Sequence, residues 1–167
     1  MKNAIYFIYK ILFITLIFLL INCSSIFDSF KMNDYPDELQ DLEWEIFNIV
    51  NSYRASMNLN ELEWNKSINF YARQHSELMA RKKVPFNHER FDWRLRKIGM
   101  TVRTNAGAEN LAINPGVGDI AETTLKAWLN SPGHKKNIEG DYDLTGVGIV
   151  KTDYDTYYFT QIFVIQN

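Results

Sequence analysis

The chain has one cysteine among its 167 residues, so it cannot form a disulfide within itself and its stability must come from a packed core. It also lacks a strong excess of either charge, because 18 Lys and Arg face 20 Asp and Glu for a formal net charge of −2. No stripe of basic residues is interleaved with aromatic ones. These properties argue against nucleic acid as a partner.

Two hydrolase signatures are missing. The sequence has no Gly-x-Ser-x-Gly turn to present a nucleophilic serine, and no His-Glu-x-x-His helix to bind a catalytic zinc ion. It has no internal repeat and no low-complexity tract. A length of this order suits one domain with one core.

A run long enough to span a bilayer is also absent from the N-terminus. Lys2 and Lys10 precede an apolar run, Ile11 to Ile21, of about eleven residues, whereas a spanning helix needs roughly twenty. The pattern predicts a signal peptide over residues 1–22, removed on export.

Leu20-Ile21-Asn22-Cys23 resembles a bacterial lipobox, and it predicts that Cys23 carries a lipid and becomes the mature N-terminus. Several acyl chains on one residue suffice for stable anchoring. Asn22 departs from the usual Gly, Ala or Ser, and the alternative is that Cys23 is an apolar residue near a cleavage site. An acylated sulfur is no nucleophile, which argues against a cysteine hydrolase.

Apolar spacing predicts helices and then strands after a tether over residues 23–37. One helix starts near Glu38, and the next is capped by Asn65 and buries Ile68, Ala72, His75 and Met79. We interpret His75 as a hydrogen-bonded core histidine in preference to a pocket residue. Two basic segments, Arg81-Lys82-Lys83 and Arg94-Leu95-Arg96-Lys97, are typical of solvated helix ends or faces.

Further along, a short helix over 90–98 is predicted to end at Gly99, and Asp119 begins a capping box whose helix runs through Leu129. Ser131 and Pro132 then start a new helical turn that holds His134. Strands over 145–151 and 157–165 follow, with Gly146 and Gly148 allowing another segment to approach closely. The four tryptophans are expected mainly in core packing: Trp44, Trp64, Trp93 and Trp128.

Four phrases in the second half resemble the CAP domain of cysteine-rich secretory proteins, venom antigens and plant pathogenesis-related proteins. They are Phe86-Asn87-His88, Ala108-Glu109-Asn110-Leu111-Ala112, Trp128-Leu129-Asn130-Ser131-Pro132-Gly133-His134 and Phe159-Thr160-Gln161-Ile162. The resemblance implies an α+β fold, a three-layer α-β-α sandwich with a central antiparallel sheet, over residues 38–167. With one cysteine, the chain is expected in the disulfide-free bacterial branch.

In eukaryotic members of that family, two histidines and two glutamates line a cation-binding cleft. His88 and Glu109 match two of these positions, whereas Ser131 and Tyr158 occupy the other two. His134 is expected to supply a second imidazole, so His88, His134 and Glu109 form a candidate site for zinc or another divalent ion. The alternative is a hydrogen-bonded network that ties loops to the core. Asn110 is expected to brace its loop, and Gln161 faces either the cleft or the ladder.

The resemblance favours a monomeric binding module at the bacterial envelope, in the outer membrane or at the surface. Its expected partners are the membrane, through the anchor, and either a small apolar ligand, a sterol or fatty acid, or a host macromolecule. A metal-dependent hydrolase with Glu109 as general base is one alternative. A structural envelope protein without a ligand site is another.

Overall fold

The computed structural model describes residues 35–104 and 106–166. The predicted signal peptide, the lipidation site at Cys23 and most of the tether lie outside the described residues. The described residues from Asp37 onward form one compact unit. Within the described ranges, no helix combines the length and the apolar character that a bilayer crossing requires.

The described chain forms helices first and a β-hairpin last. The helices are α2 (Asp37–Ser56), α3 (Lys66–Ala80), α4 (Phe91–Val102), α5 (Ile120–Leu129) and α6 (Pro132–Ile138). The strands are β1 (Glu63–Trp64), β2 (Gly107–Asn114), β3 (Leu144–Lys151) and β4 (Tyr157–Val164).

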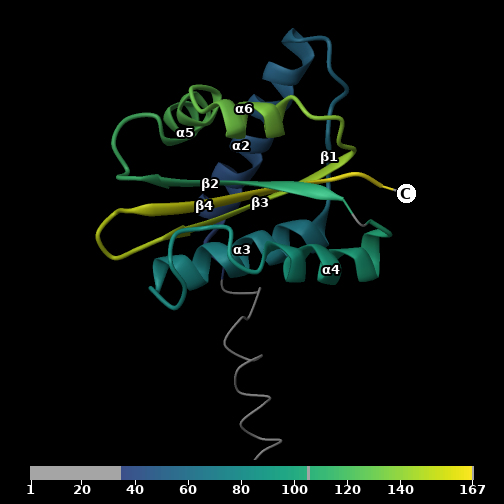
Figure 1. Cartoon of the computed structure of the whole chain (residues 1–167). Coiled ribbons are helices and arrows are strands. Elements are labelled where there is room, and N and C mark those ends of the chain that lie inside the picture. The colour runs from purple at the N-terminus through teal and green to yellow at the C-terminus, as the bar shows by residue number, and fades with distance from the viewer. Residues whose placement is uncertain (1–34, 105, 167) are drawn as a thin grey trace, which may run out of the picture. The chain divides into compact units, whose positions relative to one another are not determined.

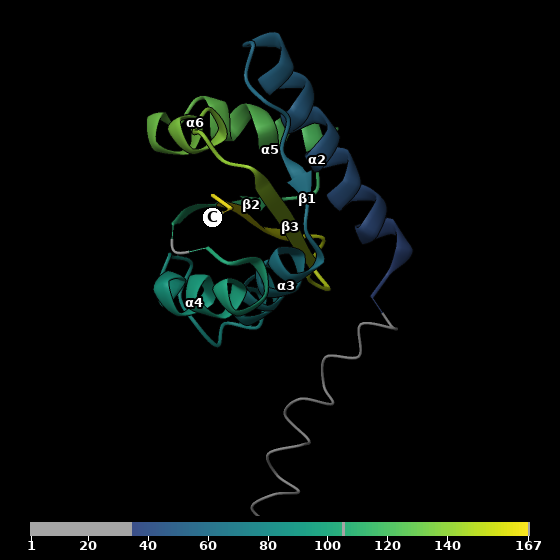
Figure 2. The same cartoon turned by 90° about the vertical axis from the view of Figure 1, so that its right-hand side faces the viewer.

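The four strands make one sheet in the order β1-β3-β4-β2. β4 pairs antiparallel with both β2 and β3, and only the two-residue β1 runs parallel to β3. Figure 1 shows α5 and α6 on one face of this sheet and α3 and α4 on the other. Turned by 90°, the molecule shows α2 running past the β3 side of the sheet (Figure 2). The α-β-α sandwich predicted by the resemblance is confirmed.

Alternation along β4 assigns its side chains to the two helical layers. Ile162 and Val164 belong to a buried cluster with Ile68 and Ala72 of α3 and Ile98 of α4. The intervening residues of β4 therefore face α5 and α6, because successive strand side chains point to opposite faces. Because β2 pairs in register with β4, the same alternation determines which face each polar residue of β2 points to.

Two glycines of β3 let α3 lie directly against the sheet. A β-carbon on Gly146 would be 2.2 Å from the backbone nitrogen of Asn69, and one on Gly148 would be 2.0 Å from that of Arg73. Both distances are far below van der Waals contact, so any side chain would push the helix away. The predicted close approach is confirmed, and its partner is the backbone of α3.

A buried ion pair closes the outer edge of β3. Glu43 of α2 binds Arg73 of α3, and its carboxylate also accepts a hydrogen bond from the backbone amide of Ile149 at 3.2 Å. Asn69 donates to Val147 O at 2.6 Å and to Glu43 at 3.0 Å. β1 pairs with only two residues of β3, and beyond them side chains form hydrogen bonds with the backbone groups of Val147 and Ile149 at this edge.

The prediction that a helix ends at Gly99 is wrong, because α4 continues to Val102. Arg103 supplies the left-handed residue after the helix, at φ 53°. Gly99 has another role: a β-carbon there would lie 2.6 Å from the carbonyl oxygen of Thr104. The glycine therefore makes room for the returning chain without ending the helix.

The predicted starts of the other helices are confirmed. Asn65 accepts backbone hydrogen bonds at the start of α3, and Asp119 accepts one from Glu122 N at 2.9 Å at the start of α5. Ser131 occupies the N-cap position of α6 with Pro132 at its start, but its side chain makes no capping hydrogen bond. Pro132 fixes the backbone at the start of this short helix, and Lys135 N donates to Ser131 O at 2.8 Å.

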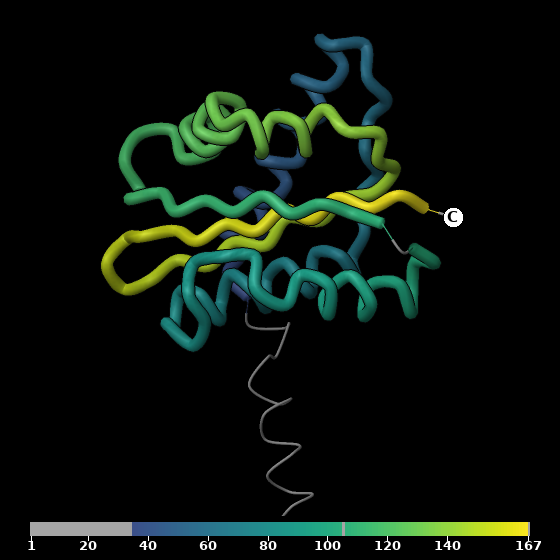
Figure 3. The backbone as a smooth tube through the Cα atoms, viewed as in Figure 1, coloured from purple at the N-terminus to yellow at the C-terminus, as the bar shows by residue number. Residues whose placement is uncertain are grey.

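β2 is the edge strand on the other side of the sheet. Trp128 of α5 is 1% exposed and donates from Nε1 to Leu111 O at 3.0 Å, while Asn137 of α6 donates to Glu109 O at 3.3 Å. The tube in Figure 3 shows β2 alongside the β3–β4 hairpin. Side chains of α5 and α6 therefore cover part of the β2 edge, which could otherwise pair with another strand.

Candidate functional site

Glu109 lies in the middle of β2 and is 5% exposed. It pairs in register with Ile162, so its side chain points to the α3 and α4 face. There Arg94 of α4 donates from Nε to Oε2 at 2.9 Å and from Nη2 to Oε1 at 2.7 Å. A buried carboxylate thus has a buried guanidinium as its main partner, in the two-point geometry typical of strong pairs.

His88 makes the third contact with this carboxylate, from the loop between α3 and α4. Its Nδ1 lies 2.9 Å from Glu109 Oε1, and its side chain is 52% exposed. Because an ionised carboxylate only accepts, His88 donates from Nδ1. The predicted meeting of His88 and Glu109 is therefore present, with one partner in the core and one in solvent.

His75 of α3 lies beside the same carboxylate, 4.0 Å from Glu109 Oε1, and is 2% exposed. Its Nε2 donates to Asn87 O at 3.0 Å, so this core histidine is hydrogen-bonded as predicted. Burial lowers the pKa of His75 and the charge of Arg94 lowers it further, although Glu109 acts in the opposite direction. The neutral imidazole is thereby favoured.

His134 approaches from the opposite layer. It lies on α6, and its backbone oxygen accepts a hydrogen bond from Asn110 Nδ2 at 3.0 Å. Asn137 donates to Asn110 Oδ1 at 2.8 Å, so Asn110 ties α6 to β2. It lies within a strand and does not brace a loop as expected. Burial lowers the pKa of His134, and the charge of His88 lowers it further.

Gln161 and Tyr158 do not join the contacts of Glu109. Gln161 faces the α5 and α6 side of β4, is fully buried and donates to Thr145 Oγ1 at 3.2 Å. Its Oε1 is the one buried side-chain polar atom of the described residues without a hydrogen-bond partner. Tyr158 shares a face with Glu109 but contacts Phe86, with ring centroids 6.5 Å apart.

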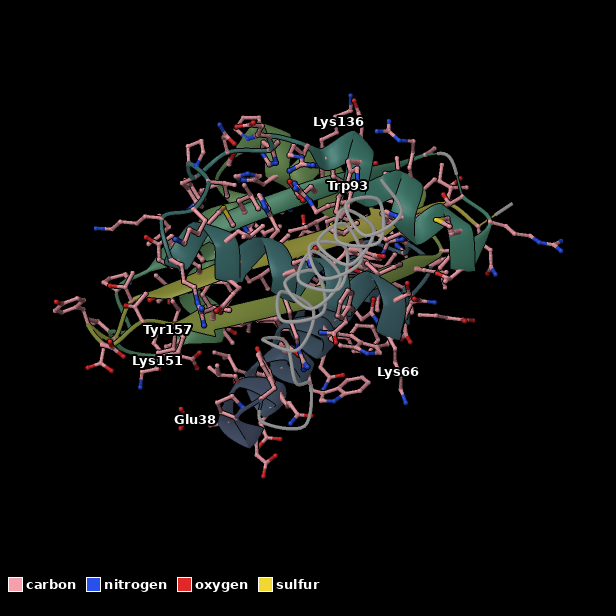
Figure 4. The ribbon with its side chains drawn as sticks, turned by 90° about the horizontal axis from the view of Figure 1, so that it is seen from below. Glu38, Lys66, Trp93, Lys136, Lys151 and Tyr157 are labelled. Carbon is pink, nitrogen blue, oxygen red and sulfur yellow. The ribbon has the colours of Figure 1, made fainter. Side chains whose placement is uncertain are left out.

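Tyr158 also lines a hollow of about 550 Å³ between the end of α3 and the β3–β4 turn. The remaining lining residues are Glu77, Ala80, Arg81, Lys82, Val150, Lys151, Thr152, Asp153, Tyr154 and Thr156. Lys151 and Tyr157 lie together at this end of the sheet (Figure 4). The hollow is therefore a mixed surface of aromatic and charged side chains.

The contacts of Glu109 bear on the predicted metal set of His88, His134 and Glu109. Both oxygens of Glu109 are occupied by Arg94, and one of them also by His88. Over the described ranges, no three His, Cys, Asp or Glu side chains are arranged to hold a metal ion. The arrangement fits the alternative of a hydrogen-bonded network better, and zinc binding stays a prediction of the resemblance.

Arg94 is the residue that sequence reasoning missed. The basic pattern of its segment predicts a solvated helix end or face, but Arg94 is 4% exposed, whereas Arg96 two residues later is exposed. The spacing of residues along the helix could have identified it. Arg94 lies four residues before Ile98 and therefore shares the inward stripe of α4.

Comparison with known proteins agrees with this fold. The family profile "CAP: Cysteine-rich secretory protein family" matches residues 47–163. The chain belongs to this family. Its CAP domain is 32% identical over 126 residues to the Bacillus subtilis membrane protein YlbC, which covers 73% of this chain and 34% of YlbC.

Two solved structures share the fold. An outer surface protein from Borrelia burgdorferi has a TM-score of 0.66 at 22% identity, over 76% of this chain and 94% of that one. An extracellular protein containing an SCP domain from Bacillus anthracis has a TM-score of 0.62 at 26% identity, over 79% of this chain and 44% of that one. The chain thus spans about a third of YlbC and less than half of the B. anthracis protein.

Proposed function

We propose that this chain is an exported, lipid-anchored envelope protein whose CAP domain binds a small apolar ligand with an acidic head group, such as a fatty acid. The observation that carries the proposal is the hollow of about 550 Å³ beside Tyr158. Its volume is within the range of small-molecule sites, roughly 300–1,000 Å³.

Part of the wall of the hollow is apolar. Val150 and Ala80 contribute apolar side chains, and Tyr154, which is 90% exposed, also lines the hollow. Phe86 is 48% exposed and packs against Tyr158, so the exposed aromatic surface extends beyond the hollow. An acyl chain lying there would cover aromatic surface that solvent now contacts.

The rim supplies cations for a carboxylate head group. Arg81 and Lys151 are already paired, with Glu77 and Asp155 respectively. Lys82 lines the same hollow and is exposed. Lys82 is therefore the cation that we expect to contact the ligand, with the two paired residues holding the surrounding surface in place.

The polar centre at Glu109 favours binding over hydrolysis. A general base needs a carboxylate oxygen within reach of a water or substrate proton. Arg94 donates a hydrogen bond to each of the two oxygens of Glu109, at 2.9 and 2.7 Å. We therefore assign the Glu109 centre a structural role beside the ligand site.

Export and anchoring are supported by the sequence of residues 1–23 and by the kind of protein to which this chain is similar. The structures described above are of an outer surface protein and an extracellular protein, and YlbC is a membrane protein. A radiolabelled fatty acid fed to expressing cells should label the chain, and Cys23→Ser should remove the label. Labelling that persists in this variant would refute anchoring at Cys23.

The ligand proposal is tested by titrating residues 24–167 with a fluorescent long-chain fatty acid. We expect saturable binding at micromolar concentration. Lys82→Ala and Tyr154→Ala should each weaken it several-fold with an unchanged melting temperature. Lys83→Ala is the matched control, because Lys83 is also exposed but is not among the residues that line the hollow. Absence of binding, or equal loss in the Lys83 variant, would refute the proposal.

A further inference from the structure

Trp44 does not have the core position expected for it. It is 45% exposed on α2, although it stacks on Trp64 of β1 with ring centroids 4.5 Å apart and planes at 28°. Phe47 meets both indoles edge-on, at 5.5 Å in each case. We call these three side chains the aromatic platform. The indole of Trp44 is its solvent-exposed part, and the platform shares no residue with the Glu109 centre.

The platform is held rigidly. Trp64 belongs to β1, where the flanking amides of Glu63 and Asn65 donate to Asp143 O and Thr145 O, each at 2.8 Å. Phe47 is half-buried on the helix, one turn from Trp44. A partner that stacks on Trp44 would therefore meet a surface whose ordering entropy has already been lost on folding.

The surroundings of Trp44 are acidic. Asp41 and Asp37 lie one and two turns before it on the same face of α2, and both are exposed. From Asp37 to Tyr53 the helix contains no basic residue. Glu38 projects outward from the start of α2 in Figure 4. The first basic residue after Trp64 in the sequence is Lys66, at the start of α3.

We propose that the aromatic platform and the acidic start of α2 form a docking surface for a basic segment of a partner protein, with an Arg or Lys side chain lying on the open face of Trp44. An indole face attracts such cations, and tryptophan is the best of the aromatic residues for this contact. Asp37 and Asp41 supply the complementary charge.

The charge around Trp44 also favours a basic peptide over other ligands that can stack on an exposed tryptophan. Nucleic acids and anionic membranes would be repelled by the aspartates. A neutral sugar could stack on the indole, but it would leave the acidic rim without a charged partner. The observations therefore favour a basic peptide over these alternatives.

The test uses the full chain in a non-ionic detergent and a short peptide of alternating glycine and arginine, with binding measured by calorimetry. We expect Trp44→Ala to weaken binding about tenfold and Trp44→Phe to weaken it less. Asp41→Asn should weaken it about threefold and reduce its dependence on salt. Melting temperatures check that each variant is folded.

Glu122→Gln is the matched control, because it removes the same charge from an exposed position on α5. Unchanged binding in this variant supports docking at α2. An equal loss in Asp41→Asn and Glu122→Gln, or undiminished binding in Trp44→Ala, would overturn the proposal. So would a neutral oligosaccharide that binds at Trp44 where the arginine peptide does not.

Discussion

Arg94 and Glu109 form a two-point ion pair inside the domain, with the guanidinium of α4 donating at 2.9 and 2.7 Å to the two carboxylate oxygens of β2. Both side chains are at most 5% exposed. The pair joins the edge strand to the helix beneath it. Glu109 also holds His88, so the position of the exposed imidazole depends on this buried contact.

Removing Arg94 should destabilise the domain strongly. Arg94→Leu leaves Glu109 buried without its main counter-charge, and breaking a buried pair in this way costs about 3–5 kcal/mol. The free energy of unfolding, measured by urea titration, gives the value. The double variant with Glu109→Leu should lose less than the two single variants together. Additive losses would contradict the coupling.

Gly148 should tolerate no side chain. A β-carbon there would lie 2.0 Å from the backbone nitrogen of Arg73, so α3 has to shift away from the sheet in Gly148→Ala. We expect a loss of roughly 3 kcal/mol or more in unfolding free energy. Gly133→Ala in α6 is the control, because nothing lies within 4 Å of its β-carbon. Similar stabilities for the two variants would show that β3 and α3 are not in close contact.

Stability should fall in mild acid through His75. Its pKa lies below the ordinary 6.5 because burial and Arg94 disfavour the imidazolium, so the unfolded chain binds a proton that the native chain refuses. Stability is retained above pH 6.5 and lost as the pH falls toward the lower native pKa. Urea midpoints at about pH 7.5 and pH 5.5 measure this loss.

His75→Asn should show a smaller loss between these two pH values than the wild type. His134→Asn is a useful comparison, since the pKa of His134 is also lowered but by lesser burial, so that its removal should change the slope less. An identical pH dependence in wild type and His75→Asn would exclude His75 as the source.

Asn137 should control the attachment of α6. It donates to Asn110 Oδ1 and Glu109 O, and Asn110 in turn donates to His134 O. Asn137→Ala leaves these acceptors short of a donor, with an expected loss of about 1–2 kcal/mol. Hydrogen exchange should accelerate in α6 and remain slow in α3. Unchanged protection in α6 would mean that other contacts hold the helix.

The helical part of the fold could be predicted from local sequence because its signals are local. Asn65 and Asp119 act as caps within three residues of themselves, and the apolar stripe of α3 repeats at helical spacing. β2 carries no comparable signal. Its sequence, Gly107 to Asn114, has only one β-branched residue, and it is a strand because β4 pairs with it and α5 and α6 cover its edge.

The candidate site was predictable only in part, for a similar reason. The meeting of His88 and Glu109 followed from the family resemblance, and coordinates were needed to show that Arg94 occupies the carboxylate. Gln161 illustrates the limit, since one step of strand parity puts it on the opposite face from Glu109. The face to which a strand residue points depends on the register of the strands, which the sequence of a single strand does not specify.

The central claim is that ligand binding takes place in the hollow beside Tyr158 and not at the Glu109 centre. The most direct measurement is a crystal structure of residues 24–167 grown with a long-chain fatty acid. We predict an acyl chain against Tyr158 and Val150, a carboxylate near Lys82, and an unchanged Arg94–Glu109 pair. A ligand bound through Glu109 and His88, or an empty hollow at saturating fatty acid, would contradict the account.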